Sequence, residues 1–319
     1  MSESSSSSSH HLGRRHRHLS LWDLVAIGVG GTVGSGIFVL AGYVAHHYAG
    51  PSTTLSFAMA GLAAACSGIC YAELAGRLPS GGSTYTFCYT AMGEVFAVLG
   101  MACLSLEYVV AGAAVARSWG TKTNQWILHN VDDNDNNENE DGNTLNLWAC
   151  AVCVVSTAIL VKGIKESKLA TNVFTVLKVA LVLFMTVGGF CYFSLDNWTP
   201  FVPRGQSGIA EGATACFFAY LGYDGVCVLA GEAQRPRRNV PRAVLWTLAI
   251  VTVLYMLAVL ALTGMLPYQQ LDDTSAFYQA FQHHQAPWLA QITAVNAYSK
   301  IHTHDTQTHS FFVYRRVRS

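Results

Sequence analysis

Ser20–Gly50 reads SLWDLVAIGVGGTVGSGIFVLAGYVAHHYAG, an apolar stretch with six glycines between positions 28 and 42. About twenty consecutive apolar residues are enough for one helix to cross a bilayer. Glycine in a helix interior costs about 1 kcal/mol relative to alanine, so this cluster predicts a break near Gly34-Ser35-Gly36. Non-helical backbone is tolerated at membrane depth only where it is buried in protein or lines a cavity. The alternatives are a glycine face for close helix packing and a nucleotide loop, and the latter lacks its βαβ context.

A second interruption is expected in the sequence FFAYLGYDG, residues 217–225, where two glycines and Asp224 lie inside another apolar run. Two glycine-interrupted helices in corresponding positions of two halves indicate a transporter site near the bilayer midplane. The free N–H groups at the start of a half-helix suit a carboxylate. Carbonyls left over at the breaks can accept hydrogen bonds from an ammonium group. The two breaks together therefore suit an amino acid zwitterion.

The composition is that of a membrane protein. Hydrophobic residues make up 51% of the 319 residues and charged residues 12%, about half the usual share of roughly 25%. The charges fall in clusters between long apolar runs, as they do in loops between membrane spans. We expect an all-α polytopic membrane protein with about seven transmembrane helices, at residues 24–45, 55–75, 95–116, 145–161, 173–193, 209–230 and 243–266.

The lysines and arginines predict the orientation of the chain. With the N-terminus in the cytosol, the inside segments hold eleven of them and the outside loops between spans hold three, namely Arg117, Lys122 and Arg204. An excess of positive charge on one side marks the cytoplasmic face. Glu73 and Glu232 lie at inner helix ends, where we expect them to pair with Arg77 and with the arginines of residues 235–242.

Other classes of function find little support. The formal net charge is zero and the chain has no sustained basic stripe, which argues against nucleic acid as a partner. The sequence places no His/Asp/Glu constellation at one depth with catalytic spacing, so we expect neither an enzyme nor a cofactor. No metal site is expected either. Cys150 and Cys153 form a C-x-x-C, but they lie one helical turn apart among apolar residues with no second pair.

Several ordered motifs resemble the cationic amino acid transporter family of the amino acid–polyamine–organocation superfamily. The likeness runs from about residue 20 to residue 295. Besides the opening stretch and residues 217–224, it is carried by CYAEL (70–74), LPSGGSTY (78–85), GIKES (163–167) and GEAQRPRRNVP (231–241). The resemblance implies the first part of a five-plus-five inverted repeat in which helices 1 and 6 are broken. It also implies an amino acid substrate, a lipid bilayer as the surroundings, and either the plasma membrane or a vacuolar membrane; it favours no oligomeric state.

The resemblance also implies where the substrate would bind. The backbone N–H groups of Gly34, Ser35 and Gly36 would receive its carboxylate. Its α-ammonium group would be held by carbonyls near Thr32 and in the segment Phe217, Phe218, Ala219 and Tyr220. Phe218 or Tyr220 would close over the bound substrate as a gate.

Three ionisable residues within the spans are candidates for further roles. Lys178 lies inside the fifth span, where a lysine costs about 2.5–3.5 kcal/mol and is by default functional. In some members of the family that the chain resembles, this lysine replaces a metal ion and couples transport to protons; a lysine that reaches the cytosol is the alternative. Glu107 would contact a cationic substrate side chain or pair with Arg117 or Lys178. Asp224 would serve as a gate residue or as an acceptor for the broken helix.

The two ends of the chain differ from the middle. Residues 1–19 predict a disordered cytosolic tail, residues 20–295 a partial permease domain, and residues 296–319 (NAYSKIHTHDTQTHSFFVYRRVRS) an atypical polar tail. The family continues with further helices, so we expect a truncated chain that inserts but transports poorly or not at all. The alternatives are a membrane partner that modulates a full-length relative and a seven-helix receptor or sensor; such receptors place the N-terminus outside, against the charge bias.

Overall fold

The computed structural model describes residues 19–78, 83–131, 168–273 and 275–285, with short pieces between residues 150 and 158. Throughout these residues the regular elements are helices, and the one extended pairing is an isolated bridge between Leu19 and Ala233. Most of the predicted fourth span lies outside the described residues, although Cys150 and Cys153 are described. Residues 1–18, residues 296–319 and the motif GIKES also lie outside them.

The first predicted span forms two helices rather than one. Helix α1 covers Leu21–Thr32 and helix α2 covers Ser35–Val44, and Val33 and Gly34 between them are not helical. The side chain of Ser20 accepts a hydrogen bond from the backbone of Asp23, whose carboxylate accepts one from the backbone of Ser20. This reciprocal cap fixes the start of α1.

The chain leaves α2 through two short turns. A π-helical turn, η1, covers Ala45–Ala49, and a 3-10 turn, η2, covers Gly50–Ser52. Helix α3 (Thr53–Arg77) then runs back along the bundle.

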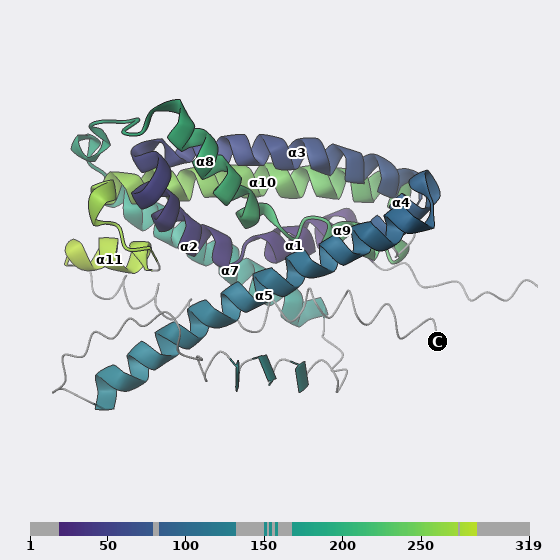
Figure 1. The fold of residues 1–319 in the computed structure, drawn as a ribbon, viewed down its shortest axis with the longest axis horizontal. Coiled ribbons are helices and arrows are strands. Elements are labelled where there is room, and N and C mark those ends of the chain that lie inside the picture. The colour runs from purple at the N-terminus through teal and green to yellow at the C-terminus, as the bar shows by residue number, and fades with distance from the viewer. Residues whose placement is uncertain are drawn as a thin grey trace, which may run out of the picture.

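Helix α10 (Pro236–Met265) lies at the centre of the bundle. It packs against α3, α1 and α7 (Lys168–Cys191), and α3 also packs against α8 (Gly205–Phe217). Figure 1 shows α3 and α10 side by side along the long axis, with α1 and α2 beneath them. Because α1, α2, α3 and α9 all contact it, α10 is the scaffold that positions both breaks.

Helices α4 (Ser83–Met92) and α5 (Glu94–Val131) form a separate helical pair beside the bundle. The two pack on each other, and α5 crosses the front of the bundle diagonally in Figure 1. Helix α5 continues well past the expected end of the third span at residue 116.

The sixth predicted span is also broken. Helix α8 ends at Phe217 and is followed by a 3-10 turn, η4 (Phe218–Tyr220), four turn residues, a short helix α9 (Gly225–Val228) and the 3-10 turn η5 (Leu229–Gly231). Three short elements lie outside the long helices: η3 (Leu195–Trp198), η6 (Tyr268–Gln270) and α11 (Ala276–His283).

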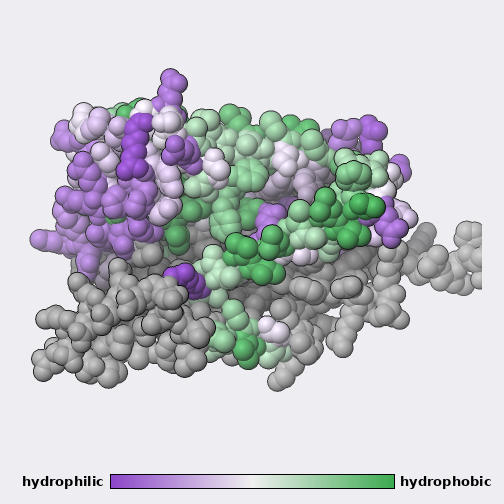
Figure 2. All heavy atoms as spheres, in the orientation of Figure 1, coloured by the Kyte–Doolittle hydropathy of each residue, from purple (hydrophilic) through white to green (hydrophobic). Residues whose placement is uncertain are grey.

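The chain is an all-α polytopic membrane protein. Four helical stretches of the described residues are long and apolar enough to cross a membrane, Gly36–Arg77, Glu94–Ala114, Gly205–Gly231 and Pro236–Met265, and Leu21–Thr32 and Thr175–Cys191 are shorter apolar helices. In Figure 2 apolar residues dominate the middle of the visible surface and hydrophilic residues gather at its two ends. An apolar band between polar ends is the surface that a bilayer requires.

Three predicted inner segments, at Leu19, at the end of α3 and at the start of α10, lie together at one end of the bundle. Leu19 donates to the carbonyl of Glu232 and accepts from Gln234, and the backbone of Gly76 lies against the start of α10. Arg77 pairs with Glu73 at 2.6 Å, as predicted, whereas Glu232 forms no ion pair within the described part of the chain. We call this region the arginine end; of the residues that the charge count assigns to the cytosol, it holds Arg77 and the arginines of residues 235–242.

Candidate functional site

The first break leaves the backbone N–H groups at the start of α2 without helical partners. Val33 has an extended backbone (φ −70°, ψ 94°), Gly34 is the N-cap of α2, and no side chain caps the helix. The first N–H groups of a helix have no partner within it and carry the positive end of its dipole. The backbone N–H groups of Gly34, Ser35 and Gly36 therefore lie at the break; that they bind a carboxylate stays a prediction.

The second break lies in the chain between Tyr220 and Gly225. After η4 the backbone turns at Gly222, whose φ of +111° belongs to a region that side-chain-bearing residues rarely adopt. The four turn residues end the helical ladder, so the carbonyls at the end of α8 and in η4 lose regular partners. The resemblance implies that residues 217–220 provide carbonyl acceptors here, and that role stays a prediction; the carbonyl of Phe218 accepts from the backbone of Leu221.

The two breaks are in direct contact. A Cβ atom on Gly36 would lie 2.6 Å from the Cα atom of Ala219, so only glycine allows the two backbones to approach this closely. The hydroxyl oxygen of Tyr255, on α10, lies 2.9 Å from the carbonyl oxygen of Thr32 and 3.1 Å from that of Ala219. One buried hydroxyl group thus contacts the last residue of α1 and the middle of η4.

Lys178 lies at the first break. Its ammonium group, on α7, donates to the carbonyl oxygen of Gly30 at 3.1 Å. Gly30 is in the last turn of α1, where carbonyl groups lack helical partners and the helix dipole is negative. The cation is therefore held by the chain itself rather than exposed at the membrane surface.

Asp224 is buried beside the second break. Its two carboxylate oxygens each lie 2.9 Å from the hydroxyl oxygen of Tyr108, on α5. Glu107, the neighbouring residue on α5, is exposed and forms no ion pair with Lys178 or with any other described residue.

The aromatic residues of the second break differ in exposure. Tyr220 is fully buried, and its hydroxyl donates to the carbonyl of Phe57 on α3 at 2.9 Å. Phe218 is half-buried and Phe217 is 37% exposed. Of the two gate candidates, Tyr220 is thus tied to the bundle in this conformation, while Phe218 keeps a partly open side.

Two residues of the site are absent from the sequence prediction, Tyr108 and Tyr255. Tyr255 is the single tyrosine of the predicted span 243–266, and a buried tyrosine hydroxyl requires a hydrogen-bond partner. That requirement predicts a hydrogen-bond partner for the hydroxyl of Tyr255, although it does not identify the partner residue. Tyr108 carries the same signal, but the sequence prediction names only its ionisable neighbour Glu107 as a candidate.

The chemistry of the arrangement is that of binding. The start of α2 offers N–H donors and the ends of α1 and α8 offer carbonyl acceptors, and the breaks include the buried residues Thr32, Gly36 and Ala219. Such an environment can hold a small molecule that carries a negative and a positive group close together.

Comparison with known proteins gives one family and a group of relatives. Residues 19–299 match the family described as amino acid permease. The chain is 38% identical over 288 residues to the methylthioribose transporter of Bacillus subtilis, covering 88% of this chain and 62% of the relative. It is 35% identical to cationic amino acid transporter 4 of Homo sapiens (90% and 47%) and 34% identical to cationic amino acid transporter 1 of Arabidopsis thaliana (88% and 48%). The chain thus spans about half to three-fifths of the length of these relatives.

Proposed function

The chain belongs to the amino acid permease family, and from this premise we propose that it takes part in the secondary active transport of amino acids across a membrane. The proposed substrate is an amino acid zwitterion held between the two breaks. Its passage requires no covalent chemistry, so the function is transport and not catalysis. The relatives named as cationic amino acid transporters support this class of substrate.

The observation that carries the proposal is the contact of Tyr255 with both breaks, at 2.9 Å to Thr32 and 3.1 Å to Ala219. Its single proton is shared between two carbonyl oxygens, so those oxygens retain acceptor capacity for a ligand. The start of α2 is adjacent, because Gly36 lies against Ala219. A substrate ammonium group bound to the carbonyls and a carboxylate bound to Gly34, Ser35 and Gly36 would then be one amino acid backbone.

Protons are the proposed coupling ion and Lys178 is the proposed carrier. A charged Lys178 neutralises the negative end of α1 through Gly30, and loss of its proton would weaken that contact. A change in the position of α1 would reach the substrate site, because Thr32 belongs to the same helix. Asp224 and Glu107 are proposed to act near the second break, Asp224 through its bond with Tyr108.

We further propose that the arginine end faces the cytosol. The Glu73–Arg77 pair and the arginines at the start of α10 lie at this end, together with the start of α1. The positive-inside bias of the sequence would then agree with the packing. The membrane itself is proposed to be the plasma membrane or a vacuolar membrane, since relatives named vacuolar are among the matches.

Thermal unfolding of the purified chain in lipid nanodiscs tests the substrate. A ligand that binds only the folded protein at a hundred times its Kd stabilises it by about 2.7 kcal/mol. We expect arginine, lysine or a neutral amino acid to raise the unfolding temperature. Agmatine, which lacks the carboxylate, and 5-guanidinopentanoate, which lacks the α-ammonium group, should not. An absence of any shift with all amino acids would refute the proposed site.

A second candidate substrate rests on the relative from Bacillus subtilis, whose name gives methylthioribose. This sugar carries neither a carboxylate nor an ammonium group. Its addition to the same measurement separates the two classes. A shift with methylthioribose and none with amino acids would assign the breaks to a neutral ligand.

A further inference from the structure

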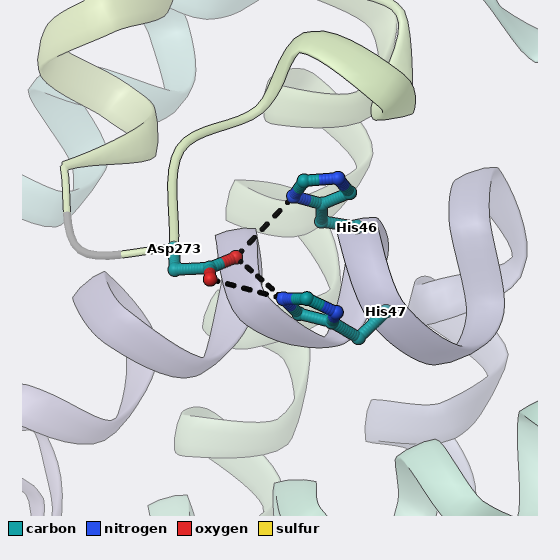
Figure 3. Close-up of side chains that lie close together, drawn as sticks. All are labelled: His46, His47 and Asp273. Atoms are coloured by element: carbon teal, nitrogen blue, oxygen red, sulfur yellow. Dashed lines mark hydrogen bonds and ion pairs between the residues drawn. The ribbon is translucent and has the colours of Figure 1, made fainter.

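A cluster of two histidines and one carboxylate lies at the end of the bundle opposite the arginine end. His46 and His47 belong to the π-helical turn η1 that follows α2, and Asp273 lies between η6 and α11. The Nε2 atom of His47 lies 2.9 Å from both carboxylate oxygens, and the Nδ1 atom of His46 lies 3.3 Å from Oδ1. Figure 3 shows both rings directed at the same carboxylate. Only the chain fold brings these groups together, since 226 positions separate His47 from Asp273.

The π-helical turn explains how neighbouring histidines converge. In an α-helix consecutive side chains point about 100° apart, so adjacent residues seldom share one ligand. Here the rings of His46 and His47 are stacked, with centroids 4.7 Å apart and planes 23° apart. Single π-helical turns occur frequently at functional sites. The turn therefore presents two imidazole nitrogens on one side.

We propose that His46, His47 and Asp273 form a binding site for a divalent transition-metal ion of the zinc type. Each residue offers one ligand atom, and the three atoms lie within 4.8 Å of one another. Zinc takes histidine nitrogen and carboxylate oxygen at about 2.0–2.2 Å, which places two ligands of a tetrahedral ion roughly 3.3 Å apart. The two separations from the carboxylate, 2.9 Å and 3.3 Å, are close to this value, and all three ligand atoms lie within 4.8 Å of one another. Water would complete the coordination.

A buried nitrogen atom without a hydrogen bond supports a metal site at this cluster. The Nδ1 atom of His46 is inaccessible to solvent, and no hydrogen bond to it is formed by the described residues. Its contact in the cluster is the 3.3 Å ion-pair distance to Oδ1 of Asp273. A buried polar atom without a hydrogen bond costs about 1–3 kcal/mol, which a coordinated ion would remove. The side chains themselves remain 40–43% exposed, so an ion can reach the cluster from solvent. The sequence alone predicts no metal here, and this proposal departs from it.

A bound ion would link η1, at the end of α2, to the segment that precedes α11. Helix α2 starts at the first break and ends in η1, while Asp273 precedes α11. The two elements already touch, since a Cβ on Gly42 would lie 2.5 Å from that of Ala276, and the rings of Phe38 and Phe277 meet edge to face. A metal bridge would hold α2 in this position. This second consequence rests on the proposed function: the ion should weaken amino acid binding or release, which requires α2 to move.

Zinc titration of the purified full chain, followed by calorimetry and thermal unfolding, tests the site. The double substitution H46Q/H47Q and the single substitution D273N should each weaken zinc binding more than about tenfold, the minimum loss seen when even supporting groups of metal sites are removed. The matched control is H10Q/H11Q, another adjacent histidine pair, which should keep the high-affinity site. Unfolding temperatures without zinc show whether each variant is folded.

The possible results of these measurements distinguish the metal site, its bridging role and the proposed function. If H46Q/H47Q and D273N bind zinc as tightly as H10Q/H11Q, the metal site is refuted and the cluster is an ion pair only. Zinc binding that D273N abolishes supports the site whatever happens to transport. If zinc then leaves amino acid affinity and exchange unchanged, the bridging role is refuted. A failure of amino acids to bind even without zinc counts against the proposed function alone.

Discussion

The ammonium nitrogen of Lys178 lies 3.1 Å from the carbonyl oxygen of Gly30, within the last turn of α1. The two residues are 148 positions apart and belong to helices that pack side by side. A positive charge at this end of a helix is stabilised by the helix dipole. The end of α1 therefore already contains a cation that belongs to the chain, two residues before the break.

The first prediction concerns the coupling role of Lys178. If its proton is exchanged when substrate binds, binding should change the number of bound protons. Calorimetric titration with amino acid in two buffers of different ionisation enthalpy measures that number. We expect a non-zero value for the unaltered chain and a value near zero for Lys178→Met, which keeps the length of the side chain but removes the titrating group.

The control for this measurement is Arg77→Met, which removes a cation from an exposed pair with Glu73 and should leave the proton number unchanged. Exposed pairs of this kind contribute little to stability. An unchanged proton number in Lys178→Met would exclude this lysine as the coupling group.

The second prediction concerns the contact of the two breaks at Gly36. In Gly36→Ala the new Cβ atom would meet the backbone of Ala219 at 2.6 Å, and backbone atoms cannot move aside as a flexible side chain can. We expect the breaks to separate and amino acid affinity to fall at least about tenfold, a loss of roughly 1.4 kcal/mol. Gly100→Ala is the control, because its Cβ atom would meet Cys88 at an ordinary 3.4 Å. Equal affinities in the two variants would contradict the arrangement.

The sequence predicts the two breaks because their causes are local. Glycines clustered in residues 28–42, and two glycines with an acid in residues 217–225, lower helix stability wherever they occur in an apolar run. The family resemblance adds which residues of each break are expected to face the substrate. Neither argument needs a contact between distant residues.

The partners of the breaks could not be predicted in this way. Tyr255 lies 223 positions from Thr32, and Tyr108 lies 116 positions from Asp224. Adjacent residues of a helix point about 100° apart, so a sequence without contacts cannot tell whether Glu107 or Tyr108 faces Asp224. The histidine cluster could not be predicted from the sequence for a second reason. Its geometry depends on a π-helical turn, and no local sequence pattern predicts that turn.

The third prediction concerns the bridge formed by Tyr255. Tyr255→Phe keeps the ring but leaves the carbonyls of Thr32 and Ala219 without their donor, and a buried unsatisfied group costs about 1–3 kcal/mol. We expect a lower unfolding temperature and weaker amino acid binding. Tyr278→Phe is the matched control, since the hydroxyl of Tyr278 contacts the exposed side chain of Gln282. If both substitutions have the same small effect, Tyr255 does not hold the breaks together.

The fourth prediction concerns Tyr108 and Asp224, which join α5 to the turn after η4. Both oxygens of Asp224 lie 2.9 Å from the hydroxyl of Tyr108, and the carboxylate is buried. Tyr108→Phe removes the donor, and Asp224→Asn keeps the size of the acceptor but reduces its capacity. Because the two groups act on each other, their effects on the free energy of unfolding should not add. A double-mutant cycle should give a coupling of about 1–3 kcal/mol. Additive effects would show that Asp224 is held by its own backbone, and that α5 packs on the second break without this hydrogen bond.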